Sequence, residues 1–269
     1  MDKKNMVFGE KTLIMGILNL TPDSFSDGGD FISEDKAVEH AMEMLRDGAD
    51  IIDIGGESSR PGHIRISAEE ELKRVMPVVK RLSRETDAIL SLDTIRAEVA
   101  EEAIKNGIHI INDIWGFQGD GEMAAVAAKY GVPAVLMHNQ NGTEYGGDII
   151  EEIKRFLMES VRIAKEAGVL DERIILDPGL GFGKTAEQNL IVMGRLREIK
   201  SLGYPVLLGA SRKSMIGKVL ELPPKDRDEG TIATTVLGIS QGMDIVRVHN
   251  VLANVRAARV ADAIVRTRL

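Results

Sequence analysis

The sequence predicts an α/β fold, a single-domain (β/α)8 TIM barrel that spans residues 1–269. Eight short apolar or β-branched runs recur along the chain, and the segments between them carry apolar residues at three- and four-residue spacing. Strands that are apolar on both faces and alternate with helices indicate parallel βαβ units, because a parallel sheet is covered on both sides. A doubly wound open sheet shares this alternation, but eight units in 269 residues favour the barrel.

The strands are predicted from the apolar runs, which lie at 13–20, 49–56, 88–94, 109–115, 133–139, 173–179, 205–211 and 244–250. The helices are predicted from the periodicity and from capping residues. Ser67 lies three residues before Glu70, which is the spacing of a capping box. Asp148 lies three residues before Glu151 and can cap a long helix at 149–167.

The composition excludes several classes of protein. The chain has no cysteine, so disulfides, thiol nucleophiles and cysteine-ligated zinc are excluded, and a metal site must use oxygen or histidine ligands. No apolar stretch approaches the roughly 18–20 residues that a membrane-spanning helix needs. A net charge of −8 disfavours nucleic acid as the main partner. We therefore expect a soluble cytoplasmic protein that binds any anionic ligand through locally placed cations.

Polar residues lie at the carboxyl end of every predicted strand: Asn19, Glu57, Asp93, Asn112, His138, Asp177, Lys213, Arg247 and His249. In parallel α/β folds this rim is where ligands bind. Taken singly, each residue has a structural explanation, since Asp93 can cap the next helix and His138 can be a buried, hydrogen-bonded histidine. Their convergence on one rim favours a shared binding site.

The segment DPGLGFGKT at 177–185 is similar to a phosphate-binding loop, but its spacing excludes that function. Three residues separate Gly179 from Gly183, whereas the Walker A motif needs four. We therefore interpret Lys184 as a solvated charge.

Eight motifs occur in order along nearly the whole chain: GILNLTPDSFSDGG (16–29), GGESSRPGH (55–63), SLDT (91–94), INDIWG (111–116), LMHN (136–139), ILDPGLGFGKT (175–185), LLGASRKSMIG (207–217) and VRVHN (246–250). Together they resemble the motifs of the dihydropteroate synthases, the folate-pathway members of the pterin-binding (β/α)8 family. The resemblance implies a Mg²⁺-dependent transferase that joins 6-hydroxymethyl-7,8-dihydropterin pyrophosphate to p-aminobenzoate and releases 7,8-dihydropteroate and pyrophosphate. It also implies a sulfonamide target.

The resemblance further implies roles for individual residues. The pterin would be bound by Asp93, Asn112, Asp177, Lys213, Arg247 and Phe182. The pyrophosphate would be bound by Asn19, Ser59, Arg60, Arg247 and His249, with Asn19 as the one protein ligand of Mg²⁺. The p-aminobenzoate would contact Phe25, Pro61, Lys213 and Ser214. Catalysis would involve Asp27, Lys213, Arg247 and His249, and Asp27 would lie in a lid that closes over the reacting carbon.

Two other functions remain open. A methyltetrahydrofolate–corrinoid methyltransferase on the same scaffold would also use Asp93, Asn112 and Asp177. It would not need both the lid DSFSDGG at 23–29 and a second loop, SSRPG at 58–62, or the SRKS segment at 211–214. A non-catalytic pterin-binding protein would leave the lid carboxylate and the phosphate-binding cations without a use.

The chain departs from the commoner family pattern at one position, since it has Asn250 where that pattern has Asp.

One predicted outer helix is unusually apolar. The segment TIATTVLGISQGM at 231–243 contains no charged residue, although an outer helix of a barrel should present a charged face to water. We expect a homodimer through this helix, with Ala233, Gly238 and Ser240 allowing close approach and Thr235 pointing outward. The alternative is that its Thr and Ser side chains alone solvate the outer face.

Overall fold

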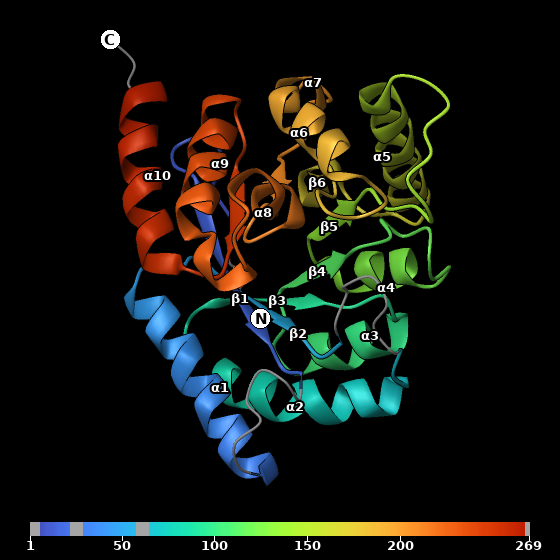
Figure 1. The fold of residues 1–269 in the computed structure, drawn as a ribbon. Helices are drawn as coiled ribbons and strands as arrows, with labels where there is room; N and C mark the ends of the chain where they lie inside the picture. Colours follow the sequence, from blue (N-terminus) through green and yellow to red (C-terminus); the bar gives the residue numbers. More distant parts are fainter. Residues whose placement is uncertain (1–5, 22–28, 58–64, 267–269) are drawn as a thin grey trace.

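The computed structural model describes residues 6–21, 29–57 and 65–266, and its strands form a parallel barrel that helices cover from outside (Figure 1). The strands are β1 (Leu13–Asn19), β2 (Ile51–Gly55), β3 (Ile89–Asp93), β4 (Ile110–Asp113), β5 (Ala134–Met137), β6 (Ile174–Asp177), β7 (Leu207–Leu208) and β8 (Ile245–Val248). Each strand lies within the range predicted from the sequence.

The sheet closes on itself, which confirms the barrel over the open sheet. The strand order is β6-β5-β4-β3-β2-β1-β8-β7, and every pair in it is parallel. The two end strands meet through a parallel bridge between Leu176 and Val206. The Leu176 amide also donates to the Pro205 carbonyl at 2.9 Å.

One described helix follows each strand, except that two follow β6 and two follow β7. They are α1 (Gly29–Arg46), α2 (Ala68–Glu85), α3 (Ala97–Lys105), α4 (Met123–Tyr130), α5 (Ile149–Glu166), α6 (Ala186–Gly194), α7 (Leu196–Lys200), α8 (Ser214–Leu220), α9 (Asp228–Ser240) and α10 (Val251–Val265), with short 3-10 turns at Asp171–Arg173 and Pro224–Asp226. Within the described residues, none of these helices has the length and apolar character needed to cross a membrane.

The capping predictions are largely confirmed. The Ser67 side chain accepts a hydrogen bond from the Glu70 amide at the start of α2, although the Glu70 carboxylate pairs with Arg74. Asp148 accepts from two amides at the start of α5. A reciprocal capping box occurs instead at the start of α6, where Thr185 and Gln188 bond to each other's backbone. This cap fixes the point at which the loop after β6 ends.

Alternation along the strands separates two cores. One residue set packs against the helices, and the other fills the inside of the barrel: Leu13, Met15, Ile51, Ile110, Val135, Ile175, Leu207 and Ile245. Because side chains on one face of a strand recur every second residue, the next inward positions lie one layer nearer the carboxyl ends. Those positions carry Asp53, Asn112, Asp177 and Arg247. An apolar floor therefore supports a polar layer.

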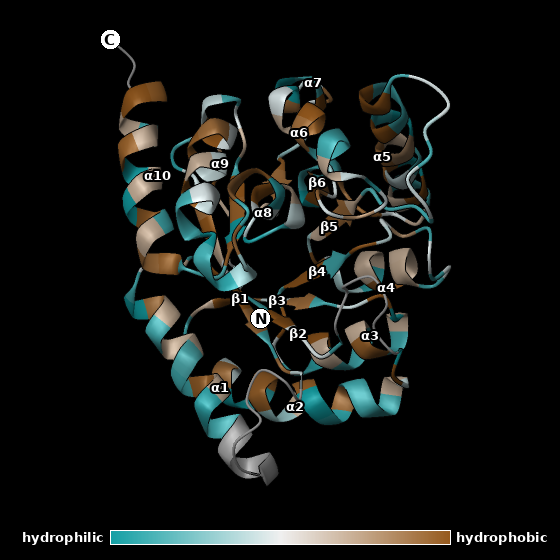
Figure 2. Cartoon of the chain, viewed as in Figure 1, coloured by the Kyte–Doolittle hydropathy of each residue, from teal (hydrophilic) through white to brown (hydrophobic). Residues whose placement is uncertain are grey.

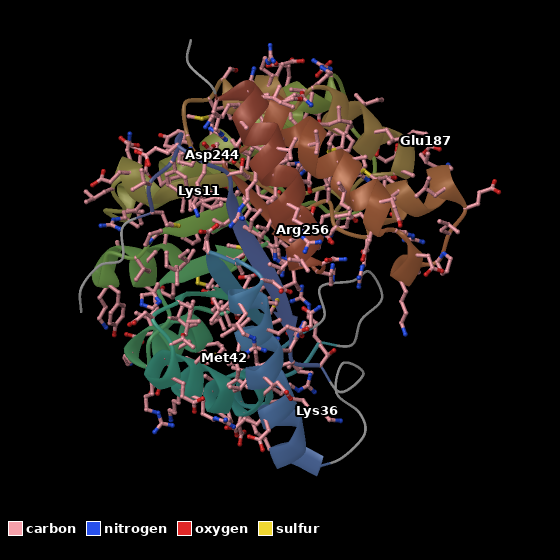
Figure 3. All side chains as sticks on the ribbon, turned by 90° about the vertical axis from the view of Figure 1, so that its left-hand side faces the viewer. Lys11, Lys36, Met42, Glu187, Asp244 and Arg256 are labelled. Atoms are coloured by element: carbon pink, nitrogen blue, oxygen red, sulfur yellow. The ribbon has the colours of Figure 1, made fainter. Side chains whose placement is uncertain are left out.

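The amino ends of the strands form the opposite, structural end of the barrel. Lys11 pairs with Asp50, and the Asp50 carboxylate also accepts from the Ile14 amide at 2.9 Å. Lys200 pairs with Asp244 at 2.5 Å, and Asp244 accepts from the Val206 amide at 2.8 Å. Lys11 and Asp244 lie at the same end of the molecule in Figure 3. Ion pairs therefore tie the amino ends of these strands to the segments around them, and the polar layer lies toward the carboxyl ends.

The expected orientation of the apolar outer helix is partly wrong. Within α9, Thr235 is buried and its hydroxyl donates to the Asn254 amide oxygen on α10 at 2.7 Å. Gly238 also faces inward, because an added Cβ would lie 2.3 Å from a methyl group of Leu208. Ala233 and Ser240 are exposed, as expected, together with Leu237. The helix is rotated so that Thr235 packs against α10 and Gly238 against the barrel.

Candidate functional site

The strand register brings four rim positions into one row. Asn19 on β1 lies beside Gly55 on β2, Gly55 lies beside Asp93 on β3, and Asp93 lies beside Asn112 on β4. Gly55 leaves space between its neighbours, since an added Cβ would lie 3.6 Å from both the Asn19 amide oxygen and the Asp93 Cβ. The sequence prediction that Asn19, Asp93 and Asn112 share one rim is therefore confirmed.

An ion-pair network crosses the inside of the barrel below this row. The Arg247 Nε donates to Asp53 Oδ2 at 2.6 Å, and its Nη2 donates to Asp93 Oδ2 at 2.9 Å. The Asn112 Nδ2 donates to the same oxygen of Asp53 at 3.0 Å. The Asp53 side chain has 0% exposure, so its charge must be compensated by these partners. The predicted site residues Arg247 and Asn112 are thereby fixed relative to the Asp53 carboxylate, and Asp93 is fixed through Arg247.

Asp53 is the main site residue that the sequence analysis missed. It lies inside the apolar run IIDIG, at an inward position two residues after Ile51. A lone carboxylate inside an apolar strand was the available signal, because such a group is rarely buried without a partner. Its Oδ1 atom is buried and has no hydrogen-bond partner among the described residues. This oxygen is an acceptor that a ligand group or water would satisfy.

Asp177 occupies the opposite wall at the end of β6. Its Oδ1 accepts from the Gly179 amide at 2.7 Å. Its Oδ2 faces Gly209, where an added Cβ would lie 3.7 Å away. Burial raises the pKa of Asp177 to about 6, although the Gly179 amide and nearby cations oppose that shift. Burial likewise raises the pKa of Asp93 to about 7 against the effect of Arg247.

Lys213 and Phe182 face each other above Asp177. The Lys213 ammonium lies 4.1 Å from the centre of the Phe182 ring, a cation–π contact. Gly181 makes this approach possible, because a Cβ there would lie 2.7 Å from Lys213 Cδ and because its φ is +81°. The loop after β6 and the turn after β7 therefore build one side of the pocket together.

The SRKS turn at 211–214 is fixed by the start of α9. Arg212 has a φ of +56°, which is unusual for a residue with a side chain. Its guanidinium binds Asp228 through two bonds of 2.7 and 3.0 Å. The Ser211 hydroxyl lies 2.9 Å from His249 Nδ1. Ser214 is exposed at the first residue of α8. The predicted residues Lys213, Ser214 and His249 are thus brought to one rim.

Asn250 suits this environment better than an aspartate. Its amide oxygen accepts from the Ala253 amide and caps α10. Its amide nitrogen donates to Asp228 at 2.9 Å, the carboxylate that also binds Arg212. An aspartate could accept at the cap, but it would place a second negative charge beside Asp228. The departure from the commoner family pattern is therefore compensated locally.

The interpretation of Lys184 as a solvated charge is wrong. Its side chain is 8% exposed, and its ammonium nitrogen bonds to the Gly179 and Phe182 carbonyls and to His138 Nδ1. The sequence could not reveal this, because the reversal of the chain at three glycines carries the side chain back under the loop. His138 is a buried, hydrogen-bonded histidine, as one of the two sequence interpretations held.

Five predicted site residues lie outside the described residues: Phe25, Asp27, Ser59, Arg60 and Pro61. Their predicted roles remain predictions. The described residues that flank them, Thr21 and Glu57, lie at the same rim after β1 and β2.

A metal at this rim would find few protein ligands. Among the described residues, no three His, Cys, Asp or Glu side chains are close enough together to hold a metal ion. Asn19 offers an amide oxygen at the end of β1. Mg²⁺ prefers oxygen ligands and retains several waters, so one amide oxygen combined with oxygens from a bound phosphate fits its chemistry.

Comparison with known proteins identifies one family. The family described as pterin binding enzyme matches residues 15–249. A dihydropteroate synthase of Clostridium beijerinckii is 59% identical over 264 residues, which cover 98% of each chain.

Solved structures agree with this match. The structure of a Clostridium difficile dihydropteroate synthase in the presence of pteroic acid has a TM-score of 0.96 and 57% identity, covering 98% of this chain and 100% of that one. A Xanthomonas albilineans dihydropteroate synthase with 4-aminobenzoic acid has a TM-score of 0.91 and 40% identity, covering 95% of this chain and 93% of that one.

The two raised carboxyl pKa values predict a specific titration of the unliganded protein. We expect the side-chain carboxyl carbons of Asp93 and Asp177 to titrate by NMR near pH 7 and 6, while the exposed Asp171, whose pKa Lys165 lowers, titrates below its ordinary value. Since the folded state binds both protons more tightly than the unfolded chain, these groups stabilise it at low pH. That contribution is lost as pH rises through about 6 and 7. Titration midpoints of Asp93 and Asp177 near that of Asp171 would contradict the conclusion that burial raises their pKa values.

Proposed function

The chain belongs to the pterin binding enzyme family, and from this premise we infer that it catalyses the dihydropteroate synthase reaction. It transfers a pterinylmethyl group from 6-hydroxymethyl-7,8-dihydropterin pyrophosphate to p-aminobenzoate and gives 7,8-dihydropteroate and pyrophosphate. The observation that carries this conclusion is the grouping of Asp93, Asn112, Asp177 and Arg247 in one polar layer of the barrel. Relatives of the same name span nearly the full chain.

The carboxylate and amide groups suit the edge of a pterin. A pterin presents an N–H and an amino group side by side, and a carboxylate such as Asp177 accepts both in a bidentate manner. Asn112 uses its amide nitrogen on Asp53, so its amide oxygen remains for the ligand. Asp93 can accept from a further ring N–H. A ligand that lacks one of these donors would leave a buried acceptor unpaired, which would cost about 1–3 kcal/mol of binding free energy for each group.

Two cations suit other parts of the pterin: Arg247 suits its flat face, and Lys213 suits its carbonyl oxygen. Arg247 is held by Asp53 and Asp93, so its planar guanidinium has a fixed orientation against which a flat ring can stack. Lys213 can donate to the ring carbonyl and an adjacent ring nitrogen. Its contact with Phe182 places that ring at the same side of the pocket.

The reaction needs negative charge to be neutralised on the leaving group. The bond between the exocyclic methylene carbon and the bridging oxygen breaks, and the electron pair leaves with pyrophosphate. We propose that Arg247, His249 and Arg60 bind the pyrophosphate, with Ser59 beside it. The amine of p-aminobenzoate then attacks the methylene carbon, and its surplus proton passes to solvent. The electron-rich dihydropterin stabilises the cation, so no covalent enzyme intermediate is required.

The loops after β1 and β2 are proposed to close over this chemistry. Asp27 would face the developing cation, while Phe25 and Pro61 would contact the aromatic amine and Ser214 its carboxylate. Ser214 is exposed at the rim, where its hydroxyl is accessible to a carboxylate. Sulfonamides, which are arylamines of similar shape, are expected to compete at the same place. We also propose a cytoplasmic location, in keeping with the absence of cysteine.

We propose that Mg²⁺ binds at Asn19 together with the substrate pyrophosphate. The support is the position of the Asn19 amide oxygen beside Gly55 and Asp93, at the rim where the pyrophosphate would lie. When bound, the ion would neutralise charge on the leaving group. Asn19 itself orients the pyrophosphate relative to the pterin pocket.

The first experiment tests the function against its two alternatives. We expect the purified protein to release pyrophosphate only when pterin pyrophosphate, p-aminobenzoate and Mg²⁺ are all present, and to form 7,8-dihydropteroate in equal amount. Asp177→Asn should lower this activity by roughly 5–150-fold, because an amide presents a donor where the ring also donates. Methyl transfer from methyltetrahydrofolate to a corrinoid, or pterin binding without turnover, would contradict the proposed reaction.

The metal proposal has its own test. We expect excess chelator to abolish turnover and added Mg²⁺ to restore it, because the leaving group would otherwise keep its charge. Binding of unphosphorylated 6-hydroxymethylpterin should not respond to the chelator, since Asn19 contacts only the pyrophosphate in this proposal. Full turnover in excess chelator would refute the assignment of Asn19 as a metal ligand.

We further propose a homodimer through the helix around residues 231–243 and its neighbour. The helices α9 and α10 lie side by side, and hydrophobic residues occur along both of them (Figures 1 and 2). Leu237 is 57% exposed on α9, and Val260 and Ile264 are 63% and 75% exposed on α10. Exposed apolar groups at this density on adjacent helices are typical of an interface.

The dimer is tested by a charge at an exposed position. We expect a dimer mass by sedimentation for the unmodified protein, and a monomer mass for Leu237→Arg with unchanged circular dichroism, because a desolvated charge would oppose association. Leu170→Arg is the matched control, since Leu170 is 58% exposed away from α9 and α10. A monomer mass for the unmodified protein at micromolar concentration would exclude this assembly.

A further inference from the structure

The buried Lys184 lies beneath the loop that presents Asp177 and Phe182 to the pocket. Its ammonium nitrogen is 2.9 Å from the Gly179 carbonyl oxygen, 3.0 Å from the Phe182 carbonyl oxygen and 2.9 Å from His138 Nδ1. A protonated lysine has three N–H donors and no acceptor, so these three acceptors match it completely. A neutral amine has two N–H donors and one lone pair, so with His138 in the tautomer that accepts at Nδ1 it would leave one of the three acceptors unmatched.

This loop depends on specific contacts for its shape. Gly179, Gly181 and Gly183 have φ values of +68°, +81° and +55°, so the backbone reverses at each without a regular hydrogen-bond ladder. Asn189 accepts from the Gly181 amide at 2.7 Å and fixes the side of the loop next to α6. Lys184 fixes the opposite side, where Gly179 bonds to Asp177 and Phe182 meets Lys213.

We propose that Lys184 is a positioning residue for the pterin pocket: its ammonium group, bonded to the Gly179 and Phe182 carbonyls and to His138, keeps the loop in the shape that presents Asp177 and Phe182 to the ring. The proposal rests on the proposed function, because it assumes that these residues bind a pterin. Lys184 does not touch the substrate. It acts through the backbone that carries Asp177 and Phe182.

The groups around Lys184 make its charge sensitive to pH near neutrality. Burial lowers the pKa of Lys184 to about 7, with Asp177 opposing the shift and Lys213 adding to it. His138 stays neutral, because burial and Lys184 lower its pKa to about 3, so its Nδ1 can accept. From the other side, Tyr145 stacks on His138 and stays protonated, since burial raises its pKa and Glu152 adds to the shift. The loop therefore loses one of its contacts as pH rises through about 7.

Calorimetry with 6-hydroxymethylpterin tests the role of this charge. The variant Lys184→Met keeps the length of the side chain and removes its donors, and Lys105→Met is the control at an exposed lysine on α3. We expect Lys184→Met to bind about tenfold more weakly than the unmodified protein at pH 6.5 and this ratio to become smaller at pH 8.5, where Lys184 is mostly neutral and keeps only two N–H donors. Ionisation of the ligand affects both proteins equally. Lys105→Met should match the unmodified protein throughout.

A purely structural role predicts a different result. Loss of packing alone would weaken Lys184→Met by the same factor at every pH, and a constant ratio would therefore overturn the proposal. If Lys184→Met does not fold, Lys184→Arg replaces it, since a guanidinium keeps its charge. We expect Lys184→Arg to remain about tenfold tighter than the unmodified protein at pH 8.5, and an identical pH profile for the two would overturn the proposal. Failure of the unmodified protein to bind the pterin at pH 6.5 would refute the proposed function itself.

Discussion

The site is organised by one fully buried carboxylate, that of Asp53, and by the side chains that pair with it. Asp53 lies on the inner face of β2 with no exposure to water, and such a charge is tolerated in a protein interior only when it is compensated. Arg247 and Asn112 provide that compensation from β8 and β4. Because Arg247 also binds Asp93, the single requirement of Asp53 fixes three side chains from three other strands. These three side chains are thus held in place by protein contacts alone.

The rest of the barrel isolates this layer. The apolar floor beneath it excludes water, and that burial raises the pKa values of Asp93 and Asp177 toward neutrality. The loops then add contacts that strand geometry cannot provide. Asp228 fixes the turn that carries Lys213, and the loop after β6 brings Phe182 against it. Recognition of a flat, polar ring follows from rigid strands, whereas the chemistry at its methylene carbon depends on the loops.

Much of this could be predicted from the sequence, for a physical reason. Apolar runs and the polar residues that end them are local patterns, so the eight strands, the shared rim and the Asp148 cap follow directly. Lys184, Thr235 and Asp53 could not be assigned in the same way. The burial of Lys184 depends on the path of a glycine-rich loop, and the orientation of Thr235 depends on how α9 rotates against α10. Asp53 gains its role only from Arg247, which lies 194 residues away in the sequence.

The central claim is that Asp53 and Arg247 act as one unit, and a double-mutant cycle measures this most directly. The free energy of unfolding in urea would be determined for the unmodified protein, Asp53→Asn, Arg247→Met and the double variant. We expect Arg247→Met to destabilise by about 3–5 kcal/mol, because it leaves Asp53 and Asp93 without their shared cation, and Asp53→Asn to destabilise by less, because Arg247 keeps Asp93. We expect the double variant to lose at least ~1 kcal/mol less than the sum of the two single changes. Additive losses, with no coupling between the two positions, would contradict the claim.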